Sequence, residues 1–254
     1  MRLANKSVVV TGASSGLGRT ICDMFAREGA GVLAVAVGTK RLEALAGSYP
    51  ECGGSLVPWK GDMLVQADID GMVDEAVRRF GRLDVLINNA GLMDDFSGVG
   101  DFDDEIFDKV LRLNLLAPAR TMRRAIREFE KEGGGVIINI ASVAGLYGGR
   151  AGAAYTASKH GLIGLTKNTA YMYANRNIRC NAVCPGSIKK EMGSDEFLQE
   201  FNQGGLALAQ RGRGLVERPG ESEEIAEAAI FLASESSSYI NGQAILVDGG
   251  WTSY

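Results

Sequence analysis

Tyr155 and Lys159 form the pair of residues in this sequence whose types and spacing most directly suggest chemistry. They lie four residues apart in a stretch with helical apolar spacing, so both side chains should lie on one face of a helix. A phenol with a reference pKa of about 10 is a poor base at neutral pH, but an ammonium group one turn away favours the phenolate. Tyr155 could therefore act as a general acid/base, with Ser142 upstream holding the substrate oxygen against it.

A glycine-rich turn follows the first apolar run and reads Thr11-Gly12-Ala13-Ser14-Ser15-Gly16-Leu17-Gly18. Glycines let the chain turn tightly and let a pyrophosphate approach the backbone, while the helix that follows offers free N–H groups to the anion. Such a turn alone also suits a plain strand-to-helix connection. Three glycines at this spacing after a first strand favour a dinucleotide site, whose oxidised nicotinamide would further favour the phenolate of Tyr155.

A second polar turn, Asn88-Asn89-Ala90-Gly91, closes the fourth predicted strand. Its two side-chain amides and its glycine could bridge neighbouring strand ends beside a cofactor. Ordinary turn chemistry explains the same residues equally well, so both interpretations stay open.

Alternating strands and helices must position these residues. The predicted strands, several of them continuously apolar, span 7–11, 31–37, 55–59, 84–88, 135–141, 178–184 and 243–247. The predicted helices span 17–28, 69–80, 105–132, 153–174 and 224–232. This alternation predicts an α/β fold with a doubly wound, Rossmann-type parallel sheet of about seven strands and helices on both faces.

The length and composition favour one domain and exclude several classes of partner. A chain of 254 residues without an internal linker predicts a single domain over 1–254. A formal net charge of −4 provides no basic field for nucleic acid. No run approaches the ~18 apolar residues of a membrane span, and the N-terminus does not resemble a signal peptide, so no membrane partner and a cytoplasmic location are expected. Four scattered cysteines and one histidine predict no metal site.

The segment 186–213 departs from the regular pattern because it is rich in glycine and polar residues and has no clear period. It leaves the carboxyl end of a strand, where ligands bind in open α/β sheets, so we expect it to be a substrate lid. Its apolar side chains suggest an adaptable pocket wall and a hydrophobic ketone or thioester as substrate; they are Phe197, Leu198, Phe201, Leu206 and Leu208.

Taken together, these motifs resemble the short-chain dehydrogenase/reductase family, in the branch of about 250 residues. The resemblance covers nearly the whole chain through TGASSGLG at 11–18, GDM at 61–63, NNAG at 88–91, LN at 113–114, the serine at 142, YTASK at 155–159, CPGSI at 184–188 and VDGG at 247–250. The order and spacing agree jointly, which is more specific than any single motif. Within the family, the sequence is most similar in its motifs to 3-oxoacyl-carrier-protein reductases, sugar dehydrogenases and bacterial hydroxysteroid dehydrogenases.

The resemblance implies hydride transfer between NAD(P)(H) and a secondary alcohol or ketone, by a catalytic tetrad of Asn114, Ser142, Tyr155 and Lys159. Asn114 would position a water that relays protons to Lys159, and Lys159 would also bond the nicotinamide ribose. The implied cofactor contacts are Gly12, Ser14, Ser15, Gly16, Leu17 and Gly18 for the phosphates and adenosine, Asp62 and Met63 for the adenine, Asn89, Ala90 and Gly91 around the adenine ribose, and Pro185, Gly186 and Ile188 for the nicotinamide. A homotetramer is also implied.

Two positions depart from the family pattern. The second strand ends in Ala36-Val37-Gly38-Thr39-Lys40-Arg41, without the aspartate of NAD-preferring relatives and without an arginine at Val37. No carboxylate would repel a 2′-phosphate, and Thr39, Lys40 or Arg41 could bind one, so we favour NADP over NAD. Lys40 and Arg41 could instead be the solvated first turn of a helix. The other departure is Lys190, where relatives often use threonine.

Two alternatives to an active oxidoreductase deserve comparison. One is a nucleotide-binding regulator that keeps the fold without the chemistry, and the other is an epimerase or dehydratase on the same sheet. The presence of both Tyr155 and Lys159 disfavours the regulator, and the short 186–213 segment disfavours an added substrate lobe. The sequence leaves open whether the substrate is a 3-oxoacyl thioester, a sugar or a steroid.

Overall fold

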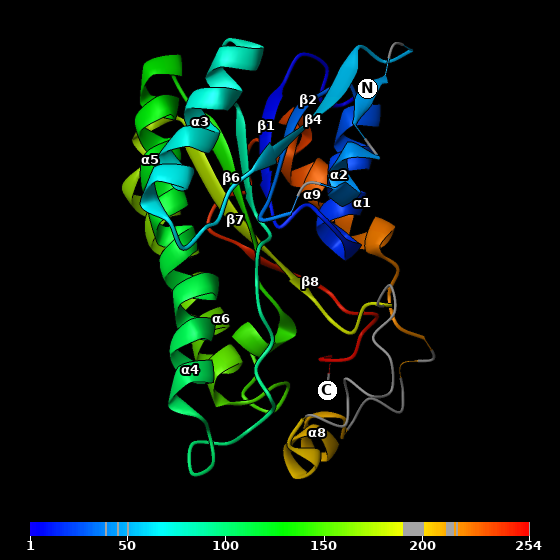
Figure 1. Cartoon of the computed structure of the whole chain (residues 1–254), viewed down its shortest axis with the longest axis vertical. Helices are drawn as coiled ribbons and strands as arrows, with labels where there is room; N and C mark the ends of the chain where they lie inside the picture. The colour runs from blue at the N-terminus through cyan, green and yellow to red at the C-terminus, as the bar shows by residue number, and fades with distance from the viewer. Residues whose placement is uncertain are drawn as a thin grey trace.

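The computed structural model describes residues 1–38, 40–44, 46–49, 51–189, 201–211, 216 and 218–253 and contains one mixed sheet (Figure 1). Within these residues the strand order is β3-β4-β2-β1-β5-β6-β7-β8. The strands are β1 (Ser7–Thr11), β2 (Gly31–Ala36), β3 (Gly47–Tyr49), β4 (Gly54–Lys60), β5 (Val85–Asn88), β6 (Gly135–Ile140), β7 (Ile178–Pro185) and β8 (Ala244–Val247). The seven predicted strands pair in parallel, which confirms the fold class, and the short β3 adds an antiparallel edge.

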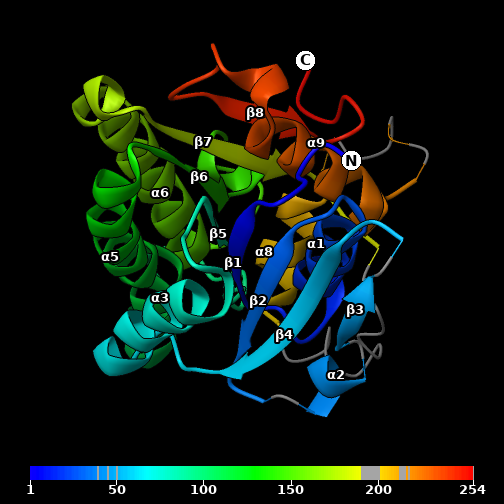
Figure 2. The ribbon, with the colours of Figure 1, turned by 90° about the horizontal axis from the view of Figure 1, so that it is seen from above.

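Helices cover both faces of the sheet, as Figure 2 shows, with α1 and α9 on one side and α3, α5 and α6 on the other. The helices are α1 (Gly16–Arg27), α2 (Lys40–Glu43), α3 (Gln66–Phe80), α4 (Asp104–Leu111), α5 (Ala117–Glu132), α6 (Ala153–Met172), α8 (Gln203–Ala209) and α9 (Ser222–Ala233). Along β1, Val8 and Val10 pack on the face covered by α1 and α9, and Val9 packs on the face covered by α3 and α5. Burial on both faces explains why this strand is continuously apolar.

The predicted helix over 105–132 is present, but it is not α-helical throughout. The structure divides it into α4, a π-helical turn (Arg112–Leu116) and α5. Pro118 lies in the first turn of α5 and cannot supply the N–H that an α-helix would direct to the Asn114 carbonyl. The π-turn contains Asn114, which is fully buried, and π-turns of this kind occur often at functional sites.

The carboxyl ends of β1, β5, β6 and β7 meet at one edge of the sheet because these strands are parallel neighbours. The candidate motifs begin at this edge, since the glycine-rich turn follows β1 and the Asn89 turn follows β5. Figure 1 shows α8 set apart from the layered body of the molecule. In the described part of the chain, no helix has the length and apolar character needed to cross a membrane.

Candidate active site

The glycine-rich turn is held in close contact with the turn after β5. Gly12 has a φ of +67°, and a Cβ there would lie 2.7 Å from the Ala90 Cα. A Cβ at Gly18 would lie 2.2 Å from the Gly12 carbonyl oxygen and 2.4 Å from Asn89 Nδ2. Neither position has room for a side chain, so these two glycines let α1 begin directly against the ends of β1 and β5.

The amino end of α1 is open and carries no competing charge. Ser15 occupies the N-cap without a side-chain hydrogen bond, and the first turn contains no acidic residue. Gly16 has a φ of +50°, and a Cβ there would meet nothing within 4 Å. Ser15, Gly16 and Leu17 line a cavity of about 880 Å³. Free N–H groups, a positive helix end and an uncrowded backbone fit the pyrophosphate of a dinucleotide.

The two asparagines after β5 have different roles. Asn89 Nδ2 donates to the carbonyls of Thr11 (3.0 Å) and Gly12 (3.1 Å), so it joins the ends of β5 and β1 beside the cavity. Asn88 faces the interior, where its amide donates to Asn139 and its oxygen accepts from the Thr121 hydroxyl. Asn89 therefore shapes the candidate site, whereas Asn88 satisfies the polar groups of the core.

Asn114 ties the π-turn to the segment that follows Gly91. Its Oδ1 accepts from the Leu92 N–H at 2.8 Å, and its Nδ2 donates to the Leu92 carbonyl at 2.8 Å and to Ser158 Oγ at 3.2 Å. A Cβ on Gly91 would lie 3.4 Å from Asn114 Oδ1 and 3.7 Å from Lys159 Nζ. Asn114 and Lys159 thus meet at the same glycine.

Ser142, Tyr155 and Lys159 converge at the end of β6. Lys159 Nζ donates to the Ile140 carbonyl at 2.8 Å and lies 5.4 Å from the centroid of the Tyr155 ring. Tyr155 is hydrogen-bonded to Ser142, whose hydroxyl oxygen also accepts from the Ala144 N–H at 3.1 Å. All three residues line the 880 Å³ cavity, so the structure brings the four predicted tetrad residues together.

Burial controls the ionisation of the central pair. It raises the pKa of Tyr155 to about 12, against the opposing effect of the Ser142 hydrogen bond, and the charges of Asp94 and Cys184 raise it further. Burial lowers the pKa of Lys159 to about 8. In the protein alone at neutral pH, Tyr155 is therefore a neutral proton donor and Lys159 is mainly charged.

The other predicted cofactor residues divide into two groups. Five of them line the cavity: Arg41, Gly91, Pro185, Gly186 and Ile188. Several do not line it, although they belong to the same edge of the sheet or to its supporting turns: Gly12, Ser14, Gly18, Lys40, Asp62, Met63 and Ala90. Met63 is buried in the core, and the Asp62 N–H donates to the Asp68 carboxylate.

Part of the predicted site lies outside the described residues. This applies to Thr39, Lys190 and, within the expected lid, to residues 190–200 and 212–213. From the described part of 186–213, residues 186–189 and Leu206, Ala209 and Gln210 line the cavity. The described part of the segment therefore contributes to the cavity wall.

Comparisons with known proteins agree over almost the whole chain. The profile of a family described as "Enoyl-(Acyl carrier protein) reductase" matches residues 12–252. The "3beta-hydroxysteroid dehydrogenase 2" of Eggerthella lenta is 42% identical, with 99% of this chain and 96% of that protein covered. The chain belongs to the short-chain dehydrogenase/reductase family.

Further relatives of this short-chain dehydrogenase/reductase support the assignment. The 3-oxoacyl-[acyl-carrier-protein] reductase of Thermotoga maritima is 36% identical, with 98% of this chain and 99% of that protein covered. A solved structure of the family from Burkholderia xenovorans is 33% identical and superposes with a TM-score of 0.89, covering 100% of this chain and 98% of the other. The protein is accordingly an NAD(P)-dependent oxidoreductase that acts on CH–OH groups.

Sequence reasoning missed Asp94, which caps α6, the helix that carries Tyr155 and Lys159. Its buried carboxylate accepts from the backbone N–H groups of Gly152 (3.2 Å) and Tyr155 (2.8 Å), at the start of α6. A Cβ on Gly152 would lie 2.5 Å from this carboxylate, so the glycine makes room for it. The sequence offered one indirect sign of such a cap. The predicted helix 153–174 is preceded by a glycine, which has no side chain to cap the helix, so a capping group from elsewhere in the chain was needed.

We predict that Asp94→Asn lowers kcat about 10-fold, because weakening a charged cap misplaces Tyr155 by a small amount. It should also move the pH profile of alcohol oxidation to lower pH, since the Asp94 charge raises the pKa of Tyr155. Steady-state kinetics between pH 6 and 11 would measure both effects. Asp95→Asn is the matched control, because among the described residues the Asp95 side chain accepts from Ser97, within its own turn. An unshifted profile would contradict the electrostatic role.

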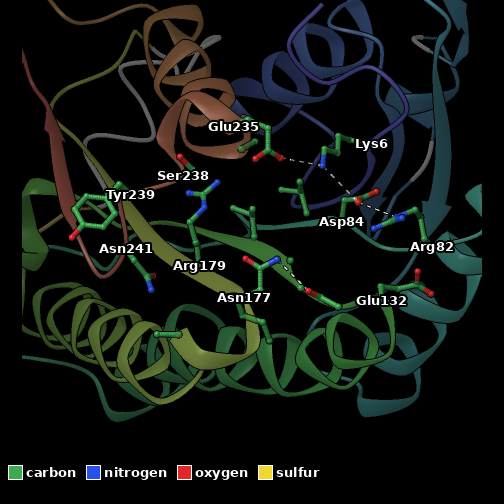
Figure 3. A pocket seen from close by; sticks show the side chains of 18 residues that line it. Lys6, Arg82, Asp84, Glu132, Asn177, Arg179, Glu235, Ser238, Tyr239 and Asn241 are labelled. Atoms are coloured by element: carbon green, nitrogen blue, oxygen red, sulfur yellow. Dashed lines mark hydrogen bonds and ion pairs between the residues drawn. The ribbon is translucent and has the colours of Figure 1, made fainter.

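A second cavity, of about 450 Å³, lies at the amino ends of the strands (Figure 3). Four of its charged groups form ion pairs: Asp84 pairs with Arg82 at 2.9 Å and with Lys6 at 4.0 Å, and Lys6 also pairs with Glu235. Arg179 donates to main-chain carbonyls at the end of α9. These bonds hold β1, β5, β7 and α9 together at the amino ends of the strands, whereas the predicted tetrad residues lie at the carboxyl ends.

Proposed function

We propose that this enzyme transfers a hydride between NADP(H) and a secondary alcohol or ketone, with Tyr155 as the general acid/base. The observation that carries the proposal is the convergence of Ser142, Tyr155 and Lys159 in one cavity, beside a turn that fits a dinucleotide. A bound nicotinamide would supply or accept the hydride and, when oxidised, place a positive charge beside the phenol.

In the reductive direction, Ser142 and Tyr155 hold the carbonyl oxygen and Tyr155 gives it a proton. The raised pKa of Tyr155 suits this direction at neutral pH because the phenol is protonated. Lys159 lies behind Tyr155, near Asn114, and returns a proton to the phenol. Pro118 has no N–H, so the main-chain carbonyl of Asn114 does not accept an α-helical hydrogen bond from it. This carbonyl is therefore suited to hold a relay water between Lys159 and solvent.

A preference for NADP is supported by the charges after β2. The described residues there include no carboxylate before Glu43, whereas Lys40 and Arg41 are exposed at the start of α2 and Arg41 lines the cavity. A 2′-phosphate reaching this point would meet a guanidinium able to bond it in a bidentate manner.

The combined variant Lys40→Ala, Arg41→Ala should weaken NADPH binding about 10-fold more than NADH binding, because only NADPH carries the 2′-phosphate. Fluorescence titration with each cofactor measures the two dissociation constants. Arg78→Ala removes an exposed cation from α3, outside the cavity, and should change neither constant. Equal weakening of both cofactors would show that neither Lys40 nor Arg41 binds the phosphate.

The substrate side of the cavity is largely apolar, with Leu92, Met93, Phe96, Val143 and Leu206 in its wall. This wall favours a hydrophobic ketone over a sugar. The similarity to a 3beta-hydroxysteroid dehydrogenase and to a 3-oxoacyl-[acyl-carrier-protein] reductase supports the same choice. We therefore propose a steroid-like ketone or a 3-oxoacyl thioester as substrate.

The proposal extends to the assembly and location of the enzyme. We propose one domain over 1–254 and a homotetramer formed through α4, α5, α6 and the edge strand β8. Exposed apolar side chains on these elements, such as Ile106, Met172 and Leu246, support this arrangement. All four cysteines are free, which supports a cytoplasmic enzyme. Light scattering of the purified protein would test the tetramer.

The function itself is tested by titrating the purified protein with NADH and NADPH, then assaying a panel of ketones and alcohols with the cofactor that binds. Tighter NADPH binding with turnover of hydrophobic ketones is the expected result. Tighter NADH binding would contradict the NADP preference and favour an oxidative role. Binding without turnover of any compound would contradict the proposed reaction.

A further inference from the structure

Arg150 and Trp251 meet in the wall of the catalytic cavity, although they come from distant parts of the chain. Arg150 lies in the loop before α6, and Trp251 lies in the turn after β8. The Arg150 guanidinium lies 4.7 Å from the centroid of the Trp251 ring. The stacking holds the Arg150 guanidinium in the wall of the cavity, which also contains the apolar side chains of Met93, Phe96 and Leu206.

The hydrogen-bonding capacity of this pair is largely unused. Arg150 donates from Nη1 to the Arg211 carbonyl at 3.1 Å. Its Nε is buried without an acceptor, and none of the described residues accepts from Nη2 or supplies a carboxylate within ion-pair distance. The indole Nε1 of Trp251 is likewise buried without an acceptor. Buried donors are normally paired, so two unpaired donors in one cavity wall point to an absent acceptor.

The free side of Arg150 has the geometry that oxyanions require. Nε and Nη2 form the edge of a guanidinium that can bond two oxygens in parallel, and among the described residues this edge has no acceptor while Nη1 is occupied. Elsewhere, exposed arginines such as Arg78 and Arg218 are already paired with carboxylates. Arg150 differs from these because no carboxylate of the described residues pairs with it.

The surrounding turns hold both donors in place. The main-chain N–H of Trp251 donates to the Asp248 carbonyl at 3.2 Å, and the Asp248 carboxylate accepts from the main-chain N–H and the hydroxyl of Thr252. The Tyr147 hydroxyl donates to the Thr252 carbonyl, which links this turn to the loop that carries Arg150. A site whose donors are held before binding loses little conformational entropy when a ligand arrives.

We propose that Arg150 and the Trp251 indole N–H bind an anionic oxygen group carried by the substrate, at a point remote from its reacting carbonyl. The apolar body of the substrate would lie against Met93, Phe96 and Leu206, and its carbonyl would reach Ser142 and Tyr155. The group is a carboxylate, or the phosphate of a thioester carrier, since both present the same paired oxygens. The inference rests on the proposed function for the reacting end of the substrate, but the anion site stands on its own contacts.

The first test compares matched ketones that differ only in charge. 9-Oxodecanoate and a 3-oxosteroid with a side-chain carboxylate are each assayed against their methyl esters, and 9-oxodecyl phosphate against 2-decanone. We expect kcat/KM to favour the anion by about 10- to 100-fold, mainly through KM, in at least one skeleton. A preference for the carboxylates identifies that source, and a preference confined to the phosphate identifies a carrier phosphate. Equal values for every charged and neutral pair would overturn the proposal.

Variants assign the preference to the two side chains. Arg150→Ala should bring the ratio of anion to neutral kcat/KM close to one, and Arg150→Lys should retain part of it, because a lysine keeps the charge without the paired donors. Trp251→Phe keeps an aromatic face but loses the N–H and should reduce the ratio less than Arg150→Ala does. Arg78→Ala is the control and should leave the ratio unchanged. An unchanged ratio in Arg150→Ala would overturn the role of Arg150.

A binding measurement separates this inference from the proposed reaction. The chain has two tryptophans, so in Trp59→Phe the emission comes from Trp251 alone. Saturable quenching by 9-oxodecanoate or by the steroid carboxylate, absent with the methyl esters and lost on adding Arg150→Ala, is the expected result. If this occurs while no ketone is reduced with either cofactor, the anion site holds and the proposed reaction fails. If ketones are reduced but neither the quenching nor kcat/KM depends on the charge of the ligand, the proposed reaction holds and the anion site fails.

Discussion

Replacing Tyr155 with phenylalanine should lower kcat by about 10²- to 10⁴-fold, because the variant has no group that can give a proton to the substrate oxygen. Cofactor binding should remain nearly intact, since the ring still fills its place beside Lys159. Ser142 would remain as a hydrogen-bond donor, so substrate binding should weaken only modestly. Steady-state kinetics together with cofactor titration separate these effects.

The matched control is Tyr171→Phe, which removes the hydroxyl of an 84% exposed tyrosine at the other end of the same helix. It should leave kcat unchanged. Comparable turnover in Tyr155→Phe and wild type would remove Tyr155 from the acid/base role. A large loss of cofactor affinity in Tyr155→Phe would instead indicate that the hydroxyl mainly serves binding.

The sequence predicted those features of the site that depend on local spacing. The four-residue interval from Tyr155 to Lys159 required only a helix, and the structure places both residues on α6. The glycines of the first turn were expected to let the chain turn tightly, and the structure leaves no room for a side chain at Gly12 or Gly18. The expected approach of a pyrophosphate to this backbone stays a prediction. Parallel strands with continuous apolar runs then determined which turns share an edge.

Features that depend on distant partners were not predictable in this way. The cap of α6 is a carboxylate about sixty residues upstream, and Arg150 meets a tryptophan about a hundred residues downstream. The π-turn at Asn114 needs one extra residue within a helix, which a periodic pattern absorbs without a visible break. The elements α2, β3 and α8 are too short to show a period, and β3 depends on pairing with β4.

Replacing Lys159 with methionine should lower activity and raise stability together. Lys159 is 3% exposed, and in the described part of the chain its ammonium donates to the Ile140 carbonyl and has no carboxylate partner. Burial lowers its pKa from 10.5 to about 8, so keeping it charged costs about 3 kcal/mol at pH 7. Methionine has a similar length and no charge. Allowing for the lost hydrogen bond, the free energy of unfolding should increase by about 1–3 kcal/mol.

The pH dependence shows whether this gain comes from the buried charge. A folded-state pKa below the unfolded value means that the cost is complete below pH 8 and disappears as the pH rises towards 10.5. Wild type should therefore gain stability relative to Lys159→Met across this interval, and the two curves should converge near its upper end. Denaturant unfolding at several pH values measures the difference. Lys167→Met, at an exposed position on the same helix, is the control and should show no such convergence.

Activity should change in the opposite direction, with kcat falling by about 10²-fold or more because no ammonium returns a proton to Tyr155. The opposed signs distinguish the proposed role from a structural one. A lysine retained for packing would lose stability when replaced, and its activity would fall only as the fold weakened. If Lys159→Met is less stable than wild type at pH 7, the ammonium contributes more through its bond to Ile140 than its burial costs. If it is more stable but inactive, the enzyme holds an unfavourable buried charge where its reaction uses a proton.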